Sequence, residues 1–368
     1  MESRLSKKRE MIRNYSFAKN KYNFIQTKKI LVIAWAPFSA RSEKIAYSLN
    51  SKLFMKGYRS KAKIFSLLKY VKLSINTLNL LHKEKPNVVI CQLPPLFLAY
   101  SILFYKLLTL SKKPDIILDL HTAAFSKPWS YFGFLNNYLF KKSLQLIVTN
   151  KQLLSEIDRK HHNKVVVLED AIFDLQEIQN KNNNNKSSIK LSNIGDSNDA
   201  ADQGLKVGII CSFAPDEPIS EIIATAKQIP DVKFFVSGDH NRVNKKISDA
   251  HQTLSNLLFT GFLDYTDYKK LISSMDVIMV LTKRNKTLLS GCYEAVMVEK
   301  PLITSNFEVL QEAFNKGTIF VDNSVEEIVN AIDQVQNNYL KLKEEIKYLK
   351  GEKNDEWNHK ISFLQSII

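Results

Sequence analysis

Cysteine is almost absent from this sequence. Cys91, Cys211 and Cys292 lie far apart in a chain of 368 residues, and none has a partner at a short spacing. This excludes a disulfide framework and a cysteine-rich zinc site, and it favours a reducing compartment. The seven histidines are scattered too, and the one adjacent pair, His161 and His162, lacks companions that could complete a metal site. We therefore expect no metal held by the protein and no cofactor.

The sequence also has no stretch that predicts insertion into a membrane. The first 24 residues carry charge but no apolar core, so no secretory signal is expected. The most apolar stretch, residues 88–110, contains two prolines and a lysine. It falls short of the roughly 20 uninterrupted apolar residues that a span needs. A strand, a turn and a buried helix explain it better, and the expected location is the cytoplasm.

Acidic residues are scarce in the first half of the chain. Residues 1–29 carry nine Lys or Arg against two Asp or Glu, and residues 30–170 carry 21 against 8. The remainder carries 22 against 27, so it is mildly acidic. A basic surface attracts nucleic acid, anionic lipid and phosphorylated compounds alike, so charge alone does not choose among them. The contrast predicts two domains with different partners.

Short apolar runs alternate with stretches of helical period along the chain. The runs typical of buried strands cover residues 28–37, 87–95, 115–121, 144–150, 164–170, 205–213, 232–239, 256–262, 277–282, 301–305 and 318–322. The expected helices cover residues 41–55, 66–83, 97–110, 219–228, 265–274, 291–298 and 325–340. This alternation predicts an α/β fold with two doubly wound parallel sheets, each Rossmann-like.

The composition suggests five segments. They are a basic N-terminal extension (1–27), a first Rossmann-like domain that binds an acceptor (28–170), an Asn/Ser-rich linker (171–204), a second Rossmann-like domain (205–343) and a C-terminal helix (344–368). The last segment would cap the second domain or cross back to the first. Ligands of such sheets bind outside the carboxyl ends of the strands, so a central cleft between the domains is the expected site.

Residues 282–306 hold the densest group of candidate residues. The stretch begins at the end of a predicted strand and continues through a loop with Lys283, Arg284 and Lys286. A loop with free N–H groups and cations, followed by a helix, is typical of a phosphate site. The alternative is a solvated surface that binds no ligand.

A short helix is expected to follow this loop. Ser290 is a good N-cap, and Gly291 would let the backbone approach a ligand closely. Glu294 lies one turn into the helix, where its carboxylate could accept hydrogen bonds from both hydroxyls of a ribose. The alternative is that Glu294 only complements the helix dipole.

Two motifs in this region carry a family resemblance. The strings Tyr293-Glu294-Ala295 and Lys300-Pro301-Leu302-Ile303 resemble the donor motif of group 1 glycosyltransferases, which have the GT-B fold. A wider string resembles a bacterial sugar-transferase subgroup of that group, through Thr282, Arg284, Thr287, Gly291 and the same Tyr-Glu-Ala. The resemblance covers most of residues 28–340 and implies that Glu294 binds the ribose of a nucleotide-sugar. Lys286 stands where the group usually has a second Glu.

The resemblance implies two further donor contacts. The turn after the first strand of the second half would face the diphosphate with Ser212, Phe213 and Asp216. The usual basic residue is absent from this turn, so Lys283 and Arg284 would supply the charge, and Asp216 could equally cap the next helix. The turn after the third strand would contact the nucleobase, or form a simple turn, with Gly261 and Phe262.

Two polar residues end the predicted strand over residues 115–121. Asp119 and His121 are two positions apart, so they project from the same face of the strand. Either could deprotonate an acceptor hydroxyl, the general-base step of an inverting transfer. In many of the resembled enzymes a His here contacts the transferred sugar, and Asp119 could simply cap a turn and bind His121. We adopt Asp119 as the base, with His121 orienting the donor sugar.

The acceptor is expected on the basic first domain. Arg41 and Ser42 follow the first strand and could hold an acceptor phosphate or begin a helix, and Trp129 could stack on a sugar or pack in the core. The basic, amphipathic residues 58–72 suit an anionic membrane surface, although an ordinary helix with one buried face shows the same pattern.

These features predict a glycosyltransferase that moves a sugar from a nucleotide-sugar donor to a saccharide or lipid-linked acceptor in cell-surface glycan synthesis. It would lie at the inner face of the plasma membrane as a peripheral protein and bind no nucleic acid. One alternative is a GT-B epimerase or hydrolase. The other is a nucleic-acid-binding protein, which the pI of about 9.4 suggests and the acidic second half disfavours.

Overall fold

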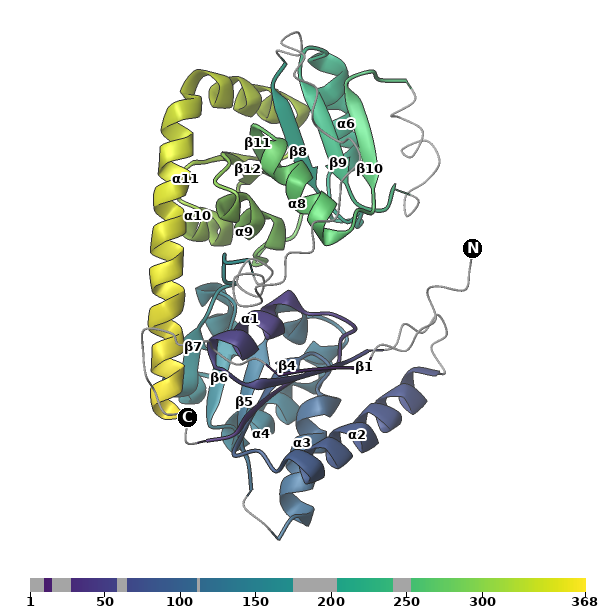
Figure 1. Cartoon of the computed structure of the whole chain (residues 1–368), viewed down its shortest axis with the longest axis vertical. Coiled ribbons are helices and arrows are strands. Elements are labelled where there is room, and N and C mark those ends of the chain that lie inside the picture. The colour runs from purple at the N-terminus through teal and green to yellow at the C-terminus, as the bar shows by residue number, and fades with distance from the viewer. Residues whose placement is uncertain (1–9, 15–27, 58–64, 111–112, 175–203, 241–252) are drawn as a thin grey trace, which may run out of the picture. The chain divides into compact units, whose positions relative to one another are not determined.

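The computed structural model describes residues 10–14, 28–57, 65–110, 113–174, 204–240 and 253–368. It consists of two compact units, and each is a largely parallel sheet with helices on both faces (Figure 1). Unit 1 comprises Met1–Ala171 with Trp357–Ile368, and unit 2 comprises Ile172–Glu356. The predicted fold class, two doubly wound α/β units, is confirmed. Most of the predicted linker, residues 175–203, lies outside the described residues.

The sheet of unit 1 has the strand order β1-β3-β2-β4-β5-β6-β7. Its strands are β1 (Glu10–Asn14), β2 (Ile30–Ala34), β3 (Lys52–Lys56), β4 (Val88–Leu93), β5 (Asp115–Leu120), β6 (Gln145–Val148) and β7 (Val165–Val167). Its helices are α1 (Ala40–Ser48), α2 (Phe65–Glu84), α3 (Phe97–Leu108) and α4 (Gly133–Lys142), with 3-10 turns η1 (Thr122–Phe125), η2 (Trp129–Phe132), η3 (Lys151–Glu156) and η4 (Arg159–Lys164). All described pairings are parallel except that of β1 with β3.

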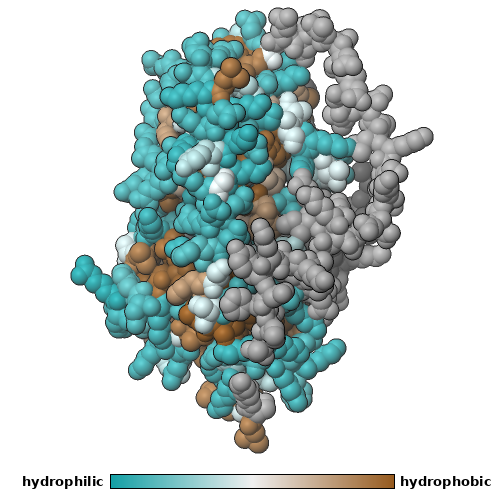
Figure 2. Space-filling view, turned by 60° about the vertical axis from the view of Figure 1, so that its left-hand side comes forward, coloured by the Kyte–Doolittle hydropathy of each residue, from teal (hydrophilic) through white to brown (hydrophobic). Residues whose placement is uncertain are grey.

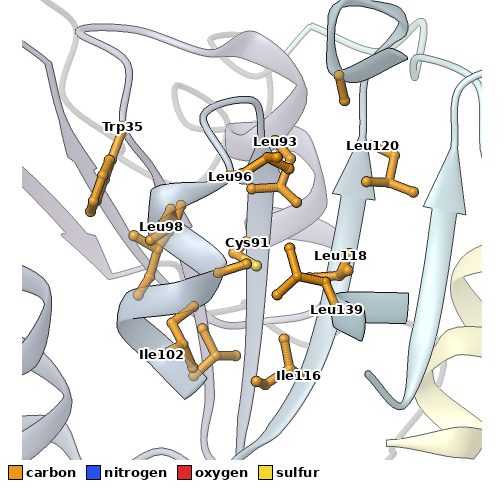
Figure 3. Close-up of a cluster of buried hydrophobic side chains, with 14 of the residues drawn as sticks. Trp35, Cys91, Leu93, Leu96, Leu98, Ile102, Ile116, Leu118, Leu120 and Leu139 are labelled. Atoms are coloured by element: carbon orange, nitrogen blue, oxygen red, sulfur yellow. The ribbon is translucent and has the colours of Figure 1, made fainter. Parts of the chain in front are cut away.

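Helices α2, α3 and α4 cover one face of this sheet. Alternate residues of β4 and β5, among them Cys91, Ile116 and Leu118, point toward Leu98 and Ile102 of α3 (Figure 3). A strand exposes every second side chain to one face, and an amphipathic helix presents a stripe to it, so the two patterns interlock in one core. This packing fixes the strands and aligns their carboxyl ends at one edge.

One predicted helix, over residues 41–55, is wrong in its second half. Helix α1 ends at Ser48, and Asn50 has a φ of 47°, a left-handed conformation that stops a helix. The chain then continues as β3, whose apolar residues are buried. Strand β1 also forms within the segment predicted as an N-terminal extension, where it pairs with β3.

The sheet of unit 2 is parallel throughout, with the order β10-β9-β8-β11-β12-β13. Its strands are β8 (Lys206–Ile210), β9 (Lys233–Ser237), β10 (Leu257–Gly261), β11 (Val277–Val280), β12 (Leu302–Ser305) and β13 (Thr318–Val321). Its helices are α6 (Ile219–Gln228), α8 (Tyr265–Ser274), α9 (Ser290–Met297), α10 (Glu308–Ala313) and most of α11 (Val325–Ile367). In order of appearance this is strand order 3-2-1-4-5-6, that of dinucleotide-binding sheets.

Each face of the unit 2 sheet has its own core. Helix α6 and the first part of α11 pack on one face, and α8, α9 and α10 pack on the other. Both cores bury Val, Ile, Leu and Phe side chains from the strands, as expected for a sheet covered on both faces.

Helix α11 belongs to both units. Its backbone departs from helical geometry at Asn338 (φ −121°, ψ 17°), near the end of the predicted helix over residues 325–340. The sequence suggested a separate segment over residues 344–368, but that segment continues the same helix. Its last part packs in unit 1, where Trp357 Nε1 donates a hydrogen bond to Ser48 Oγ at 3.1 Å. Among the described residues, no helix is both long and apolar enough to span a bilayer.

Candidate functional site

The strand order of unit 2 brings two loops together. Strands β8 and β11 are parallel neighbours, and the chain turns to opposite sides of the sheet after them. The loops that follow are residues 211–218 (loop A) and residues 281–289 (loop B). Ligands of doubly wound sheets bind at such a switch point, outside the carboxyl ends of the strands. Most of the predicted donor residues lie in these two loops or in α9, which follows loop B.

Asp216 ties loop A to loop B. Its carboxylate accepts a hydrogen bond from Thr282 Oγ1 at 3.0 Å and lies 3.0 Å from Arg284 Nη2. Its backbone oxygen accepts a hydrogen bond from Lys283 N at 2.6 Å. Helix α6 begins only at Ile219, so Asp216 does not cap it as the alternative proposed. Thr282 is buried, so the Asp216 side chain holds the two loops together.

The carboxylate of Glu217 closes on its own loop. It accepts hydrogen bonds from Ser212 N at 3.0 and 3.1 Å, from Ser212 Oγ at 3.1 Å and from Ala214 N at 2.7 Å. Backbone N–H groups that converge in this way form an anion site. In loop A the protein's own carboxylate occupies it. The sequence analysis did not single out Glu217, because spacing along the chain does not show which backbone N–H groups converge on a side chain.

The cations of loop B form ion pairs at the surface. Lys283 Nζ lies 2.8 Å from Glu221 Oε1, and the Arg284 side chain, which pairs with Asp216, is 64% exposed. Exposed ion pairs contribute little to stability, so a diphosphate can compete for both cations. Lys286, with a φ of 58°, and Thr287, whose hydroxyl donates to a loop carbonyl, lie in the same loop.

The start of α9 differs from the prediction. The helix begins at Ser290, and Leu289 is the N-cap residue, so Ser290 does not cap it. A Cβ at Gly291 would come within 3.0 Å of Ile210 Cγ2 and Val280 Cγ1. The glycine therefore lets α9 pack closely on β8 and β11, a role that the sequence analysis did not predict.

Glu294 is held by a tyrosine that the sequence analysis did not identify. The hydroxyl of Tyr268, on α8, donates a hydrogen bond to Glu294 Oε2. Burial, together with the negative charge of Glu294, raises the pKa of Tyr268 well above its usual range. The tyrosine thus stays protonated and fixes the orientation of the carboxylate. The helical period of residues 265–274 predicted the helix that carries Tyr268. It does not show which side of that helix faces α9.

The two predicted aromatic contacts differ in exposure. Phe262, after β10, is 88% exposed, and the preceding Gly261 has a φ of 71°. Phe213 is 5% exposed, and its ring meets that of Phe259 edge to face at 5.6 Å. Phe262 is therefore accessible to a base, whereas Phe213 is a core residue and its predicted ligand contact is corrected.

In unit 1, Arg41 is fully engaged inside the protein. It is 5% exposed, and its Nε and Nη2 donate to the Asp119 carboxylate at 2.9–3.1 Å. Nη1 donates to Asp170 Oδ1 at 2.8 Å and to Glu169 O at 3.0 Å, and Nη2 donates to Leu168 O at 2.9 Å. These contacts use the whole guanidinium fork. Arg41 therefore does not hold an acceptor, which corrects that prediction.

Ser42 and Trp129 also serve the framework of unit 1. Ser42 is 1% exposed, and its hydroxyl donates to Gln92 Oε1 at 2.7 Å, so it is not an acceptor contact. The ring of Trp129 lies edge to face with Tyr70 at 6.5 Å and with Phe97 at 5.8 Å. Trp129 is partly buried against the core, as the alternative interpretation expected.

Asp119 does not have the environment of a general base. It is 1% exposed and carries the ion pair with Arg41. Burial alone would raise the pKa of Asp119, but the nearby charges and hydrogen bonds of Arg41 and His121 lower it well below its usual range. A carboxylate that holds its charge so firmly accepts a proton poorly, so the assignment of Asp119 as the base is corrected.

His121 is the more accessible member of the pair. Its side chain is 28% exposed, and Nε2 lies 3.2 Å from Asp119 Oδ2. An ionised carboxylate only accepts hydrogen bonds, so Nε2 carries a proton and, in the neutral ring, Nδ1 is the acceptor. Asp119 therefore orients the imidazole. Within the described ranges, no group of three or more His, Cys, Asp or Glu side chains is placed to hold a metal ion.

Known structures share this fold at low sequence identity. The HepE protein of Anabaena, solved with UDP and glucose, has 11% identity and a TM-score of 0.65, over 93% of this chain and all of that one. Sucrose-phosphate synthase from Thermosynechococcus elongatus has 11% identity and a TM-score of 0.67, over 92% of this chain and 98% of that one. A glycosyltransferase from Rickettsia africae has 12% identity and a TM-score of 0.64, over 93% of this chain and 98% of that one.

The sequence itself matches one family model. Residues 198–351 match the model described as glycosyl transferases group 1. No curated protein has a sequence that matches this chain. The family match covers loop A, loop B and α9, and it favours the predicted transferase over an epimerase, a hydrolase or a nucleic-acid-binding protein. Residues 198–351 therefore form a group 1 glycosyltransferase domain, in a chain that has the GT-B fold.

Proposed function

We propose that unit 2 binds a nucleotide-sugar and that the enzyme transfers the sugar to a saccharide or lipid-linked acceptor held by unit 1. The observation that carries this proposal is the pairing of β8 with β11, which joins loop A, loop B and α9 at one switch point. Uridine diphosphate is the first nucleotide to test, because the Anabaena structure holds UDP.

Different residues of unit 2 bind different parts of the donor. Glu294 binds the ribose, Phe262 lies against the base, and Lys283, Arg284 and Lys286 face the diphosphate. Negative charge builds on the diphosphate as it leaves, so cations placed beside it lower the barrier to transfer. In unit 1, His121 takes the proton of the acceptor hydroxyl while Asp119 keeps the ring in position. The presence of Lys286, where retaining relatives carry a Glu, favours an inverting transfer of this kind.

Glu294→Gln tests the donor site. We expect UDP to bind more weakly by about 1.5–3 kcal/mol, the range for a hydrogen bond to a charged group. The glutamine keeps the shape but loses the charge that accepts both ribose hydroxyls. Calorimetric titration with UDP measures the change, and Glu312→Gln, an exposed glutamate on α10, is the matched control. Equal affinity of the two variants would remove Glu294 from the donor site.

Glu217→Gln tests whether the anion of loop A opposes the donor phosphates. The amide has one acceptor oxygen where the carboxylate has two, so the variant keeps part of these hydrogen bonds and loses the like charge. Coulomb's law for charges about 5 Å apart in water predicts a gain of about threefold to fivefold in UDP affinity. Uridine, which has no phosphate, serves as the control ligand and should bind both proteins equally. A loss of UDP affinity would show that the carboxylate supports the phosphate site.

The cellular part of the proposal is synthesis of a cell-surface glycan at the inner face of the plasma membrane. Its support is the basic first half of the chain, with 30 Lys or Arg against 10 Asp or Glu in residues 1–170. An anionic bilayer attracts such a surface, and a lipid-linked acceptor would be held there. Part of the predicted basic stretch, residues 58–64, lies outside the described residues, and the rest begins α2.

A further inference from the structure

The outward side of α2, α3 and α4 is unusually apolar. Hydrophilic residues cover most of the face seen in Figure 2, and hydrophobic residues lie in patches. Among the described residues, more than half of the exposed large apolar side chains lie between Leu68 and Tyr138, on these helices and on η2. A contiguous exposed apolar patch marks an interaction site.

The three helices form one continuous layer. Ser101 Oγ of α3 donates to Ser74 Oγ of α2 at 2.9 Å, and Tyr100 OH of α3 donates to Leu135 O of α4 at 3.0 Å. Their inward sides pack together on the sheet. Their outward sides therefore form a common surface, which we call the helical face.

The helical face is most apolar at the carboxyl end of α3. Leu107 is 78% exposed, and Leu110, just beyond the helix, is fully exposed. Phe104 on the same helix and Phe134 on α4 are 51% and 74% exposed. Burial of such side chains away from water is favourable, so this end is suited to enter an apolar medium.

The charge of the helical face identifies that medium. Helices α2, α3 and α4 contain six lysines and one acidic residue, Glu84, which is buried in ion pairs with Lys29 and Lys52. A face of apolar side chains surrounded by lysines complements a bilayer with anionic headgroups, and it lacks the acidic residues expected of a surface that pairs with a copy of itself.

Two lysines lie beside exposed tyrosines on this face. Lys127 Nζ is 5.6 Å from the centre of the Tyr131 ring, and Lys142 Nζ is 5.8 Å from that of Tyr138. Tyrosine and lysine side chains have an apolar body and a polar end, and both are enriched where hydrocarbon meets the headgroups. These lysine–tyrosine pairs are therefore suited to lie among the lipid headgroups when the apolar end of α3 is inserted.

We propose that the helical face docks on an anionic lipid bilayer, with Leu107 and Leu110 inserted among the lipids and the lysines bound to the headgroups. The inference rests on the proposed function, since it specifies the surface that would bring the enzyme to a lipid-linked acceptor. Docking then has an electrostatic part, which salt screens, and an apolar part, which salt does not weaken.

Co-sedimentation with vesicles separates the two parts. Phosphatidylcholine vesicles with and without phosphatidylglycerol are used at low and at high salt. The wild type should bind the anionic vesicles more strongly and keep a measurable fraction bound at high salt. Leu107→Ser with Leu110→Ser should lower the high-salt partition by about tenfold or more. Leu340→Ser is the matched control, because Leu340 is 77% exposed on α11 and lies in unit 2.

A second variant tests the charges. Lys141→Glu with Lys142→Glu should lower binding at low salt by about tenfold or more and change the high-salt fraction little. Unchanged binding in both double variants, or no binding by the wild type, would overturn the proposal. Concentration-dependent dimers of the wild type that the leucine variant abolishes would also overturn it. UDP affinity, measured on the same proteins without vesicles, reports the donor site separately.

Discussion

Replacement of His121 by alanine is expected to lower turnover by roughly 10²–10⁴-fold, the usual contribution of a general base. The physical reason is the pair at the end of β5, in which ionised Asp119 accepts from Nε2 and leaves Nδ1 to take a proton. Turnover is measured as release of nucleoside diphosphate at saturating donor. UDP affinity should be nearly unchanged, because the donor residues lie in unit 2.

His82→Ala provides the control for this prediction. His82 is exposed near the end of α2, in the same unit, and its loss should leave turnover at the wild-type level. A His121→Ala enzyme with near-normal turnover would show that no base is needed from this residue. A product that keeps the anomeric configuration of the donor would exclude the inverting course.

The second large effect is on stability. Arg41→Ala leaves the carboxylate of Asp119 buried without its partner, and a broken buried pair costs about 3–5 kcal/mol. The three tryptophans of the chain, Trp35, Trp129 and Trp357, all belong to unit 1, so their fluorescence during urea unfolding reports that unit. Asp115→Asn, an exposed carboxylate at the start of the same strand, should change the midpoint little.

The pH dependence gives this prediction a sign. In the wild type the pKa of Asp119 is lower in the folded than in the unfolded protein. Its stabilisation is complete above about pH 3.9 and is lost as the pH falls toward the folded value. Without Arg41, His121 alone opposes the effect of burial, which raises the pKa of Asp119, so less of this pH-dependent stabilisation remains. An unfolding midpoint of Arg41→Ala equal to that of wild type would contradict the structural role of the pair.

Local patterns predicted most of the fold. Apolar runs bounded by turn residues located all six strands of the unit 2 sheet and five of the seven in unit 1, all but β1 and β3. The helical period of residues 219–228 and 265–274 located α6 and α8 with their bounds. The error over residues 41–55 arose because α1 and β3 are separated by a left-handed Asn50, and a short apolar strand after a helix continues the helical pattern.

The sequence predicted which loops form the site better than it predicted the contacts of individual side chains. The cations of loop B and Glu294 followed from residue type and spacing, and all lie at or next to the switch point. Arg41 was misassigned because its partner, Asp119, is 78 positions away, and sequence shows charge but not pairing. Glu217 was not singled out, and the packing role of Gly291 was not predicted, for a related reason: their neighbours are set by how a loop or a helix packs.

Helix α11 has a consequence for the order in which the protein is made. Residues 357–368 complete unit 1, yet they leave the ribosome after the whole of unit 2 has been synthesised. At about 5–20 residues per second, the first unit waits on the order of ten seconds or more for its last helical turns. Until Trp357 reaches Ser48, the nascent first unit has an uncovered apolar surface. The unit that is synthesised first is therefore completed last. Its uncovered apolar surface is available to chaperones that bind nascent chains for all of that time.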